Sequence, residues 1–239
     1  MSLPKIVLFG DSHSQRSFDP KSGCWGALLA DKFQRIADVI SRGFSGYTTR
    51  FCKQLMRDVF QAIPSNEIAC VTILLGSNDA TDPSSPSGLY VPIGEYATNL
   101  EDIVNHLESV GIPKNRVIMM SPPNYFHETF HQYLVENNQT LHVKSDKQVK
   151  EYAQACKNVA AKLGVTFLDL NDIFSSHPES PTLFADGLHF STKGAELLDQ
   201  YLYPLMLDKV ERFVGTKPLN VKFPLWNEID RADPSKSFQ

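Results

Sequence analysis

Five short apolar runs are separated by longer stretches in which apolar residues recur every three or four positions. The runs cover residues 5–9, 37–42, 68–75, 116–120 and 165–169. Three of them are nearly continuous Val, Ile, Leu, Met and Phe, which is typical of strands that are covered on both faces. The sequence therefore predicts five strands with helices between them.

Four amphipathic stripes predict the main helices. The first places Phe51, Leu55 and Val59 at intervals of four, and the others cover residues 96–107, 149–163 and 197–205. Pro204 falls within the last stripe, so we expect that helix to bend or break there. Strands that alternate with helices predict an α/β fold with a parallel sheet and helices on both of its faces.

The chain has 239 residues, of which 42% are hydrophobic, and this suits one domain with a full core. We place that domain at residues 1–215. Residues 216–239 form a C-terminal extension, and Leu225 and Trp226 predict that part of it packs on the body.

The net charge of −4 and the absence of a basic patch argue against a nucleic-acid partner. The longest apolar runs are strand-sized, so insertion into a membrane is not expected. The first residues lack the pattern of a secretion signal, which makes the cytoplasm the expected compartment. The four cysteines are scattered, and we expect buried free thiols.

Candidate chemistry lies just after the strands, where parallel α/β sheets bind their ligands. The first strand ends in Gly10-Asp11-Ser12, which places a serine on a tight turn that opens a helix. The second is followed by Gly46, whose bare backbone N–H can approach a ligand closely. Asn78 follows the third strand, and its amide is a neutral donor suited to a developing oxyanion.

A histidine and an aspartate complete the predicted site from a distant part of the sequence. Asp186 precedes His189 by three residues, so its carboxylate can bind Nδ1 of His189 and leave Nε2 free to take a proton from Ser12. These residues predict acyl transfer, with Ser12 as nucleophile, His189 as base and Asp186 as its orienting group. The N–H groups of Ser12 and Gly46 and the amide of Asn78 form the predicted oxyanion hole.

His13 follows the serine directly and is a competing candidate for the base. Adjacent side chains at the start of a helix diverge, because helix neighbours meet at three or four residues rather than one. We therefore expect His189 to be the base and His13 to be dispensable for the chemistry.

With these residues in place, the sequence resembles the SGNH, or GDSL-type, hydrolases, and within them the isoamyl acetate-hydrolysing esterase branch. The stretches that carry the resemblance are LFGDS, RGFSGYTTR, LLGSNDA, VPIGEYATNL, MSPP, ADGLHFSTKGAELL and PLWNEID. The sequence departs from the family in having His13 where Leu or Ile is common. It also has Ser41-Arg42-Gly43 where an Asn commonly precedes the glycines.

The resemblance implies a three-layer α/β/α sandwich with a flavodoxin-like parallel sheet of about five strands. It implies a Ser-His-Asp esterase that needs no cofactor and whose partner is a small ester, with short acyl groups such as acetate favoured. Acetylated sugars, acyl thioesters, longer lipids and transfer of the acyl group to an alcohol stay open, as does a homo-oligomer.

Two other classes of function compete with an esterase. His127-Glu128-Thr129-Phe130-His131 matches the HExxH pattern of zinc peptidases, with Glu151 as a candidate third ligand. A helix in this segment can instead cover the mouth of a substrate pocket, which is its more ordinary role. A binding protein on a hydrolase scaffold is the remaining alternative.

Overall fold

The computed structural model describes residues 3–217, 219 and 223–238. Its centre is a five-stranded parallel sheet with the order β2-β1-β3-β4-β5. The strands are Lys5–Gly10 (β1), Asp38–Gly43 (β2), Ile68–Leu74 (β3), Val117–Met120 (β4) and Thr166–Leu168 (β5). All five predicted strands are therefore confirmed, with ends that differ by at most one residue.

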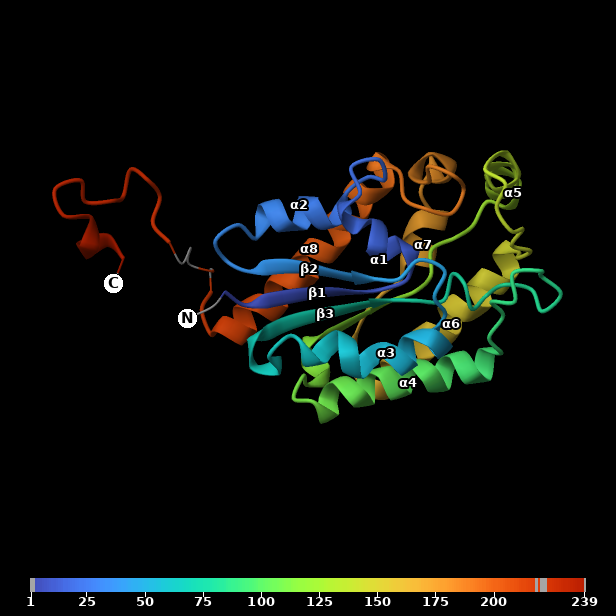
Figure 1. Ribbon diagram of the computed structural model, residues 1–239, viewed down its shortest axis with the longest axis horizontal. Coiled ribbons are helices and arrows are strands. Elements are labelled where there is room, and N and C mark those ends of the chain that lie inside the picture. The colour runs from blue at the N-terminus through green and yellow to red at the C-terminus, as the bar shows by residue number, and fades with distance from the viewer. Residues whose placement is uncertain (1–2, 218, 220–222, 239) are drawn as a thin grey trace.

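Helices cover both faces of the sheet and give the predicted three-layer sandwich (Figure 1). They are Ser12–Gln15 (α1), Trp25–Lys32 (α2), Thr49–Gln61 (α3), Ile93–Ser109 (α4), His127–Glu136 (α5), Asp146–Leu163 (α6), Leu170–Ser175 (α7) and Thr192–Val214 (α8). The strand order reverses direction at β1, between β2 and β3, as in the flavodoxin-like arrangement.

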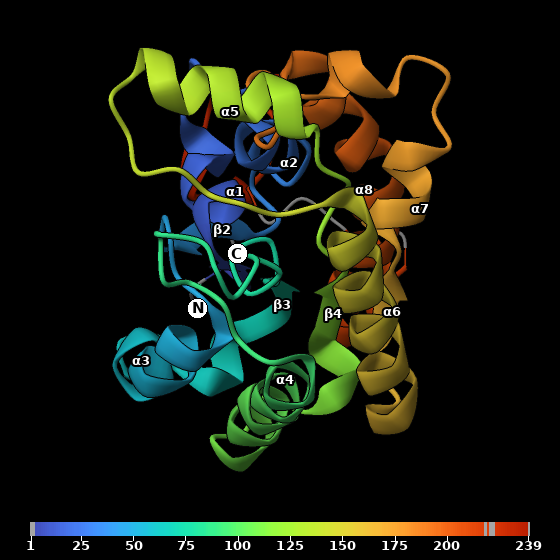
Figure 2. The ribbon, with the colours of Figure 1, turned by 90° about the vertical axis from the view of Figure 1, so that its right-hand side faces the viewer.

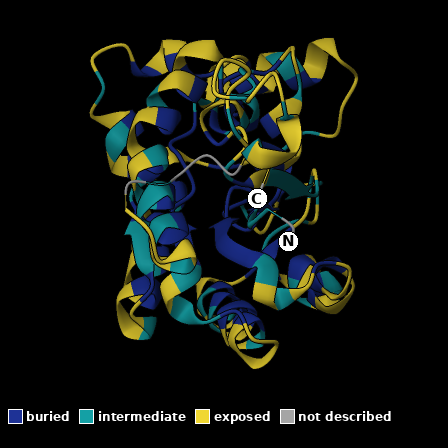
Figure 3. Cartoon of the chain, turned by 90° about the vertical axis from the view of Figure 1, so that its left-hand side faces the viewer, coloured by how far each residue is buried: buried dark blue, intermediate teal, exposed yellow. Residues whose placement is uncertain are grey.

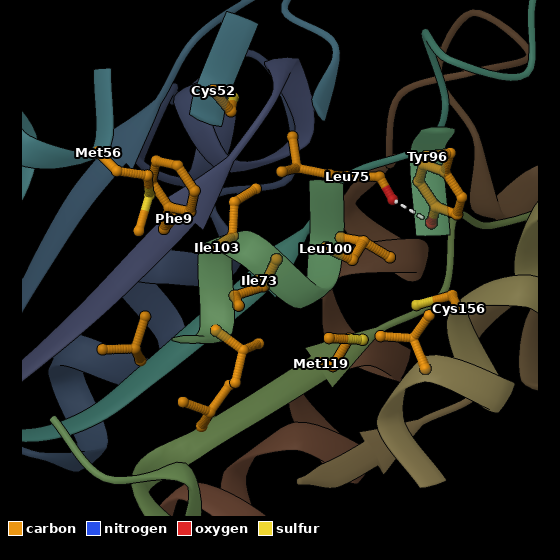
Figure 4. Close-up of a cluster of buried hydrophobic side chains, with 14 of the residues drawn as sticks. Phe9, Cys52, Met56, Ile73, Leu75, Tyr96, Leu100, Ile103, Met119 and Cys156 are labelled. Atoms are coloured by element: carbon orange, nitrogen blue, oxygen red, sulfur yellow. Dashed lines mark hydrogen bonds between the residues drawn. The ribbon is translucent and has the colours of Figure 1, made fainter. Parts of the chain in front are cut away.

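Successive side chains of β1 point to opposite faces of the sheet, and the core is divided into two clusters, one on each face. Ile6 and Leu8 pack with α2 and α8 on one face, whereas Val7 and Phe9 pack with α3, α4 and α6 on the other. Figure 4 shows part of the second cluster, in which the Tyr96 hydroxyl also donates a hydrogen bond of 3.1 Å to the carbonyl oxygen of Leu75. In Figure 3 the outer faces of the helices are exposed, whereas the inner strands β1, β3 and β4 are buried and the edge strands β2 and β5 are only partly covered.

Two predictions about the helices need correction. In the predicted stripe of α3, Val59 is buried and Leu55 packs against the core, but Phe51 is exposed and contacts the ring of Tyr47 instead. The helix α8 continues through Pro204 and buries side chains on either side of it, so it does not break there, and a bend at Pro204 stays a prediction.

The carboxyl ends of the strands lie at the right of Figure 1 and face the viewer in Figure 2. The short helix α1 starts there, and α5 crosses the same end of the molecule. In the C-terminal extension, Leu225 and Trp226 are exposed, and packing of the extension on the body stays a prediction.

Candidate active site

Ser12 stands on a tight turn between β1 and α1. The side chain of Asp11 caps the turn, since its Oδ1 accepts a hydrogen bond of 3.0 Å from the N–H of His13. The Asp11 N–H in turn donates to the carbonyl oxygen of Leu74 at the end of β3. Gly10 and Gly43 allow this close packing, because a Cβ on Gly10 would lie 2.3 Å from the Leu74 oxygen and one on Gly43 1.8 Å from the nitrogen of Gln15.

The fold brings Ser12 together with two residues that are more than 170 positions away in the sequence. His189 Nε2 lies 2.9 Å from Ser12 Oγ, and His189 Nδ1 lies 2.7 Å from Asp186 Oδ2. The other oxygen of Asp186 accepts hydrogen bonds from the N–H groups of Leu188 and His189. The carboxylate is thus fixed by its own loop, and it in turn fixes the imidazole.

The electrostatics of this loop suit a neutral histidine beside an ionised aspartate. Burial by itself would raise the pKa of Asp186, but the hydrogen bonds from His189 and the loop N–H groups outweigh it and lower the pKa to about 2. Burial lowers the pKa of His189 below its usual value, although Asp186 partly opposes the shift. Arg16 lies 3.5 Å from Asp186 and adds positive charge on the outer side.

Gly46 and Asn78 lie on neighbouring loops that are tied to each other. One N–H of the Asn78 amide donates a hydrogen bond of 2.9 Å to the carbonyl oxygen of Tyr47, which leaves the second N–H for a ligand. Gly46 adopts a left-handed conformation with φ of 78°, and no described residue accepts a hydrogen bond from its N–H. The N–H of Phe44 donates to Gly10, which joins this loop to the end of β1.

His13 occupies a different position from the base. Its ring is buried against those of His189 and Phe190, with centroid distances of 5.5 and 4.6 Å. Among the described residues, neither of its ring nitrogens has a hydrogen-bond partner. Burial lowers the pKa of His13 well below its usual value, so the ring is neutral. The histidine that meets the Ser12 hydroxyl is therefore His189.

Two buried polar residues next to the site, Asp79 and Lys144, were assigned no role in the sequence analysis. Asp79 follows Asn78 and accepts hydrogen bonds from the Thr49 N–H and hydroxyl groups, which holds the start of α3 against the end of β3. Burial raises the pKa of Asp79 to about 7. Lys144 is buried too, although it comes from a polar loop. The Asn78-Asp79 pair gave a weak signal for Asp79, whereas Lys144 gave none.

The HExxH segment forms the predicted amphipathic helix, α5, but it does not assemble a metal site. Within the described part of the chain, no group of three or more His, Cys, Asp or Glu side chains gathers where it could hold a metal ion. The His127 ring instead contacts the Tyr125 hydroxyl. The start of α5 packs on the loop that carries Asp186 and His189, where the Gly187 carbonyl accepts a hydrogen bond from the Phe126 N–H and the Phe130 ring makes an edge contact with that of His189.

Serine hydrolases use a hydroxyl, an imidazole and a carboxylate that are joined in one chain of hydrogen bonds. They also place N–H donors without another partner beside the hydroxyl, and this site has the same arrangement. The family model of the GDSL-like lipase/acylhydrolase family matches residues 8–197 of this chain. The chain belongs to that family and is a carboxylic ester hydrolase.

Curated relatives and solved structures agree with this assignment. The chain is similar to the human isoamyl acetate-hydrolyzing esterase 1 homolog, with 37% identity over 98% of this chain and 91% of the relative. A GDSL esterase/lipase of Arabidopsis thaliana is 35% identical over 100% of this chain and 99% of its own length. The crystal structure of a lipase/acylhydrolase from Enterococcus faecalis shares the fold, with a TM-score of 0.68, 23% identity and coverage of 93% and 100%.

None of the helices in the described residues combines the length and the apolar character that a membrane span requires.

Proposed function

We propose that this protein hydrolyses short-chain, acetate-type carboxylic esters through an acyl-enzyme on Ser12. The observation that supports the assignment is the continuous chain from Ser12 Oγ to His189 Nε2 and from His189 Nδ1 to Asp186. A serine hydroxyl is a weak nucleophile until a neighbouring base takes its proton. His189 is placed and uncharged for that task.

In the acylation step, Ser12 Oγ attacks the ester carbonyl carbon while His189 takes the hydroxyl proton. Asp186 keeps the proton of His189 on Nδ1 and stabilises the imidazolium that forms. The N–H groups of Ser12 and Gly46 and the free N–H of Asn78 stabilise the negative charge on the carbonyl oxygen. His189 then protonates the alcohol as it leaves.

In the second step the same groups act on water. His189 takes a proton from a water molecule, which attacks the acyl carbon, and Ser12 leaves with the proton returned by the imidazolium. Acid is released and the enzyme returns to its starting state, so no cofactor enters the cycle.

Two observations support a small ester with an apolar portion. The rings of Tyr47 and Phe51 are partly exposed beside Gly46 and contact each other, which offers an apolar surface next to the oxyanion donors. The human relative carries isoamyl acetate, an ester of a branched apolar alcohol, in its name. A cytoplasmic location stays a prediction, and the four unpaired cysteines are compatible with it.

The test is hydrolysis of p-nitrophenyl esters from acetate to octanoate by the wild type and by Ser12→Ala. We expect Ser12→Ala to lose hydrolysis and labelling by a fluorophosphonate probe while it keeps the wild-type melting temperature. Ser14→Ala is the matched control, because Ser14 lies two residues away, is buried and has no hydrogen-bond partner among the described residues. Undiminished hydrolysis by Ser12→Ala would contradict the assignment, and a preference for octanoate would contradict the substrate class.

A further inference from the structure

Lys144 lies where a lysine is least expected, inside the protein beside the catalytic residues. It is 3% exposed, and its ammonium group donates a hydrogen bond of 2.7 Å to the carbonyl oxygen of Ser77. The rings of Tyr125 and Phe130 lie 5.3 and 6.0 Å from Nζ. Burial of an ammonium group costs several kcal/mol unless its surroundings compensate for it. The contacts of Lys144 must therefore offset the cost of burying its ammonium group.

Two buried carboxyl groups supply part of the compensation. Asp11 and Asp79 are completely buried, and Asp11 Oδ2 has no hydrogen-bond partner within the described part of the chain. Burial lowers the pKa of Lys144 to about 8, and the negative charges of Asp11 and Asp79 oppose that shift. Burial raises the pKa of both acids to about 7. They directly precede Ser12 and directly follow Asn78, so in their ionised forms the lysine balances their charge in two of the loops that carry the oxyanion donors.

The backbone around Lys144 is held firmly to the loop that follows Asn78. The N–H of Asp82 donates a hydrogen bond of 2.7 Å to the carbonyl oxygen of Val143, and the Val143 N–H donates one of 3.0 Å to Ser85 Oγ. One residue beyond Lys144, Ser145 forms a capping box with Gln148 at the start of α6. The ammonium group thus approaches Ser77 from a rigid support.

We propose that Lys144 is a positioning residue for the oxyanion hole. Its hydrogen bond to the Ser77 carbonyl fixes the peptide group that leads into Asn78, and so directs the Asn78 amide toward the substrate carbonyl. This inference rests on the proposed role of Asn78. A donor must be placed within a few tenths of an ångström to stabilise the transition state, so a loosened Ser77-Asn78 turn slows the chemistry while substrate binding stays nearly intact.

The charge of Lys144 also reaches the catalytic imidazole. It contributes to the lowered pKa values of His189, His13 and His142, in each case after the larger effect of burial. Arg16 acts on His189 in the same direction, and Asp186 acts in the opposite one. Removal of the lysine charge therefore raises the pKa of His189, so that the base loses activity at a higher pH than in the wild type.

A purely structural role predicts a different result. Removal of one buried charge leaves the opposite charges around it uncompensated and usually destabilises the fold. A structural lysine would therefore change the unfolding free energy and leave kcat and the pH profile of the folded enzyme unchanged.

The experiment compares Lys144→Met with Lys147→Met, which removes the same charge from an exposed position three residues away. We expect Lys144→Met to lower kcat by about 10- to 100-fold with little change in KM, less than the loss of about 100–1,000-fold typical for removal of an oxyanion donor itself. The acid limb of kcat/KM should move to higher pH. Lys147→Met should match the wild type in both measurements.

A double-mutant cycle tests whether Lys144 acts through Asn78. We expect Asn78→Ala with Lys144→Met to be no slower than Asn78→Ala alone, and fully multiplicative losses would overturn the proposal. A wild-type kcat and pH profile in Lys144→Met would also overturn it. If the methionine variant does not fold, Lys144→Gln replaces it. Because glutamine can keep the hydrogen bond without the charge, we expect that variant to keep a kcat near that of the wild type and to move the acid limb to higher pH, and an unshifted acid limb contradicts the inference.

The outcomes separate this proposal from the assignment of the catalytic serine. If Ser12→Ala is inactive and Lys144→Met behaves as the wild type, only the role of Lys144 fails. If Ser12→Ala stays active, the proposed function fails before Lys144 is considered.

Discussion

Replacement of His13 by leucine should make the protein more stable and leave it active. The imidazole is buried, and within the described residues both of its ring nitrogens lack a hydrogen-bond partner. Its neighbours are the rings of Phe190 and His189, a setting that suits an aliphatic side chain. Leucine is also common at this position in the family that the sequence resembles, so the turn between β1 and α1 can accommodate it.

The size of the effect follows from the unmet hydrogen bonds. A neutral imidazole has one donor and one acceptor, and each buried polar group left without a partner costs about 1–3 kcal/mol. Leucine removes both penalties but fits a space shaped for a flat ring, at a cost of roughly 1 kcal/mol. We therefore expect a net gain of at least about 1 kcal/mol in unfolding free energy, or at least about 2 °C in melting temperature for a chain of this length.

The assay is urea unfolding at pH 7.5 together with hydrolysis of p-nitrophenyl acetate. We expect His13→Leu to keep kcat within a few-fold of the wild type, whereas His189→Ala should be nearly inactive, because His189 Nε2 is the atom 2.9 Å from the Ser12 hydroxyl. Equal losses in the two variants would show that both rings take part in proton transfer. A fall in stability for His13→Leu would show that the ring nitrogens have partners after all.

Two further predictions concern the titration of the site and the packing of the turn. The acid limb of kcat/KM should have an apparent pKa below 6.5, because burial lowers the pKa of His189 and the neutral imidazole that acts as the base persists as the pH falls. A stopped-flow measurement of kcat/KM across a pH series checks this prediction, and an acid limb with a pKa above 6.5 would contradict it. Gly43→Ala should cost more than about 4 kcal/mol of unfolding free energy, since its Cβ would lie 1.8 Å from the nitrogen of Gln15. Gly94→Ala in α4 is the control, because its Cβ would meet nothing within 4 Å, and alanine there should be neutral or stabilising in urea unfolding.

The strands could be predicted because burial on both faces leaves a signal in consecutive residues. β3, Ile68–Leu74, is buried at every position, and its apolar run extends one residue beyond the strand. Helices leave a weaker signal, because a surface aromatic residue can imitate a core position. Phe51 was assigned to the buried stripe of α3 together with Leu55 and Val59, but its ring packs on Tyr47 at the surface instead of in the core.

The residues of the candidate site could be found for a related reason. The carboxyl ends of parallel strands meet at one edge of the sheet, so the sequence alone could predict that Ser12, Gly46 and Asn78 lie close together. Asp186 and His189 needed only a spacing of three residues on one loop. Lys144 could not be found in this way, because its hydrogen bond to Ser77 joins positions 67 residues apart and depends on how one polar loop crosses another.

Buried polar groups that lack a hydrogen-bond partner near the site lower the stability of the fold, and the sequence pattern gives no sign of them. In the described part of the chain, buried side-chain atoms without a partner occur next to each of the three strand ends. They are Asp11 Oδ2, both nitrogens of His13, Ser14 Oγ, Thr48 Oγ1 and Ser77 Oγ. Each of these residues lies within two positions of Ser12, Gly46 or Asn78. Folding alone would favour apolar side chains there. At Asp11, Thr48 and Ser77 we expect that stability is given up for a polar, preorganised environment where charge develops, whereas His13 and Ser14 should be replaceable without loss of activity.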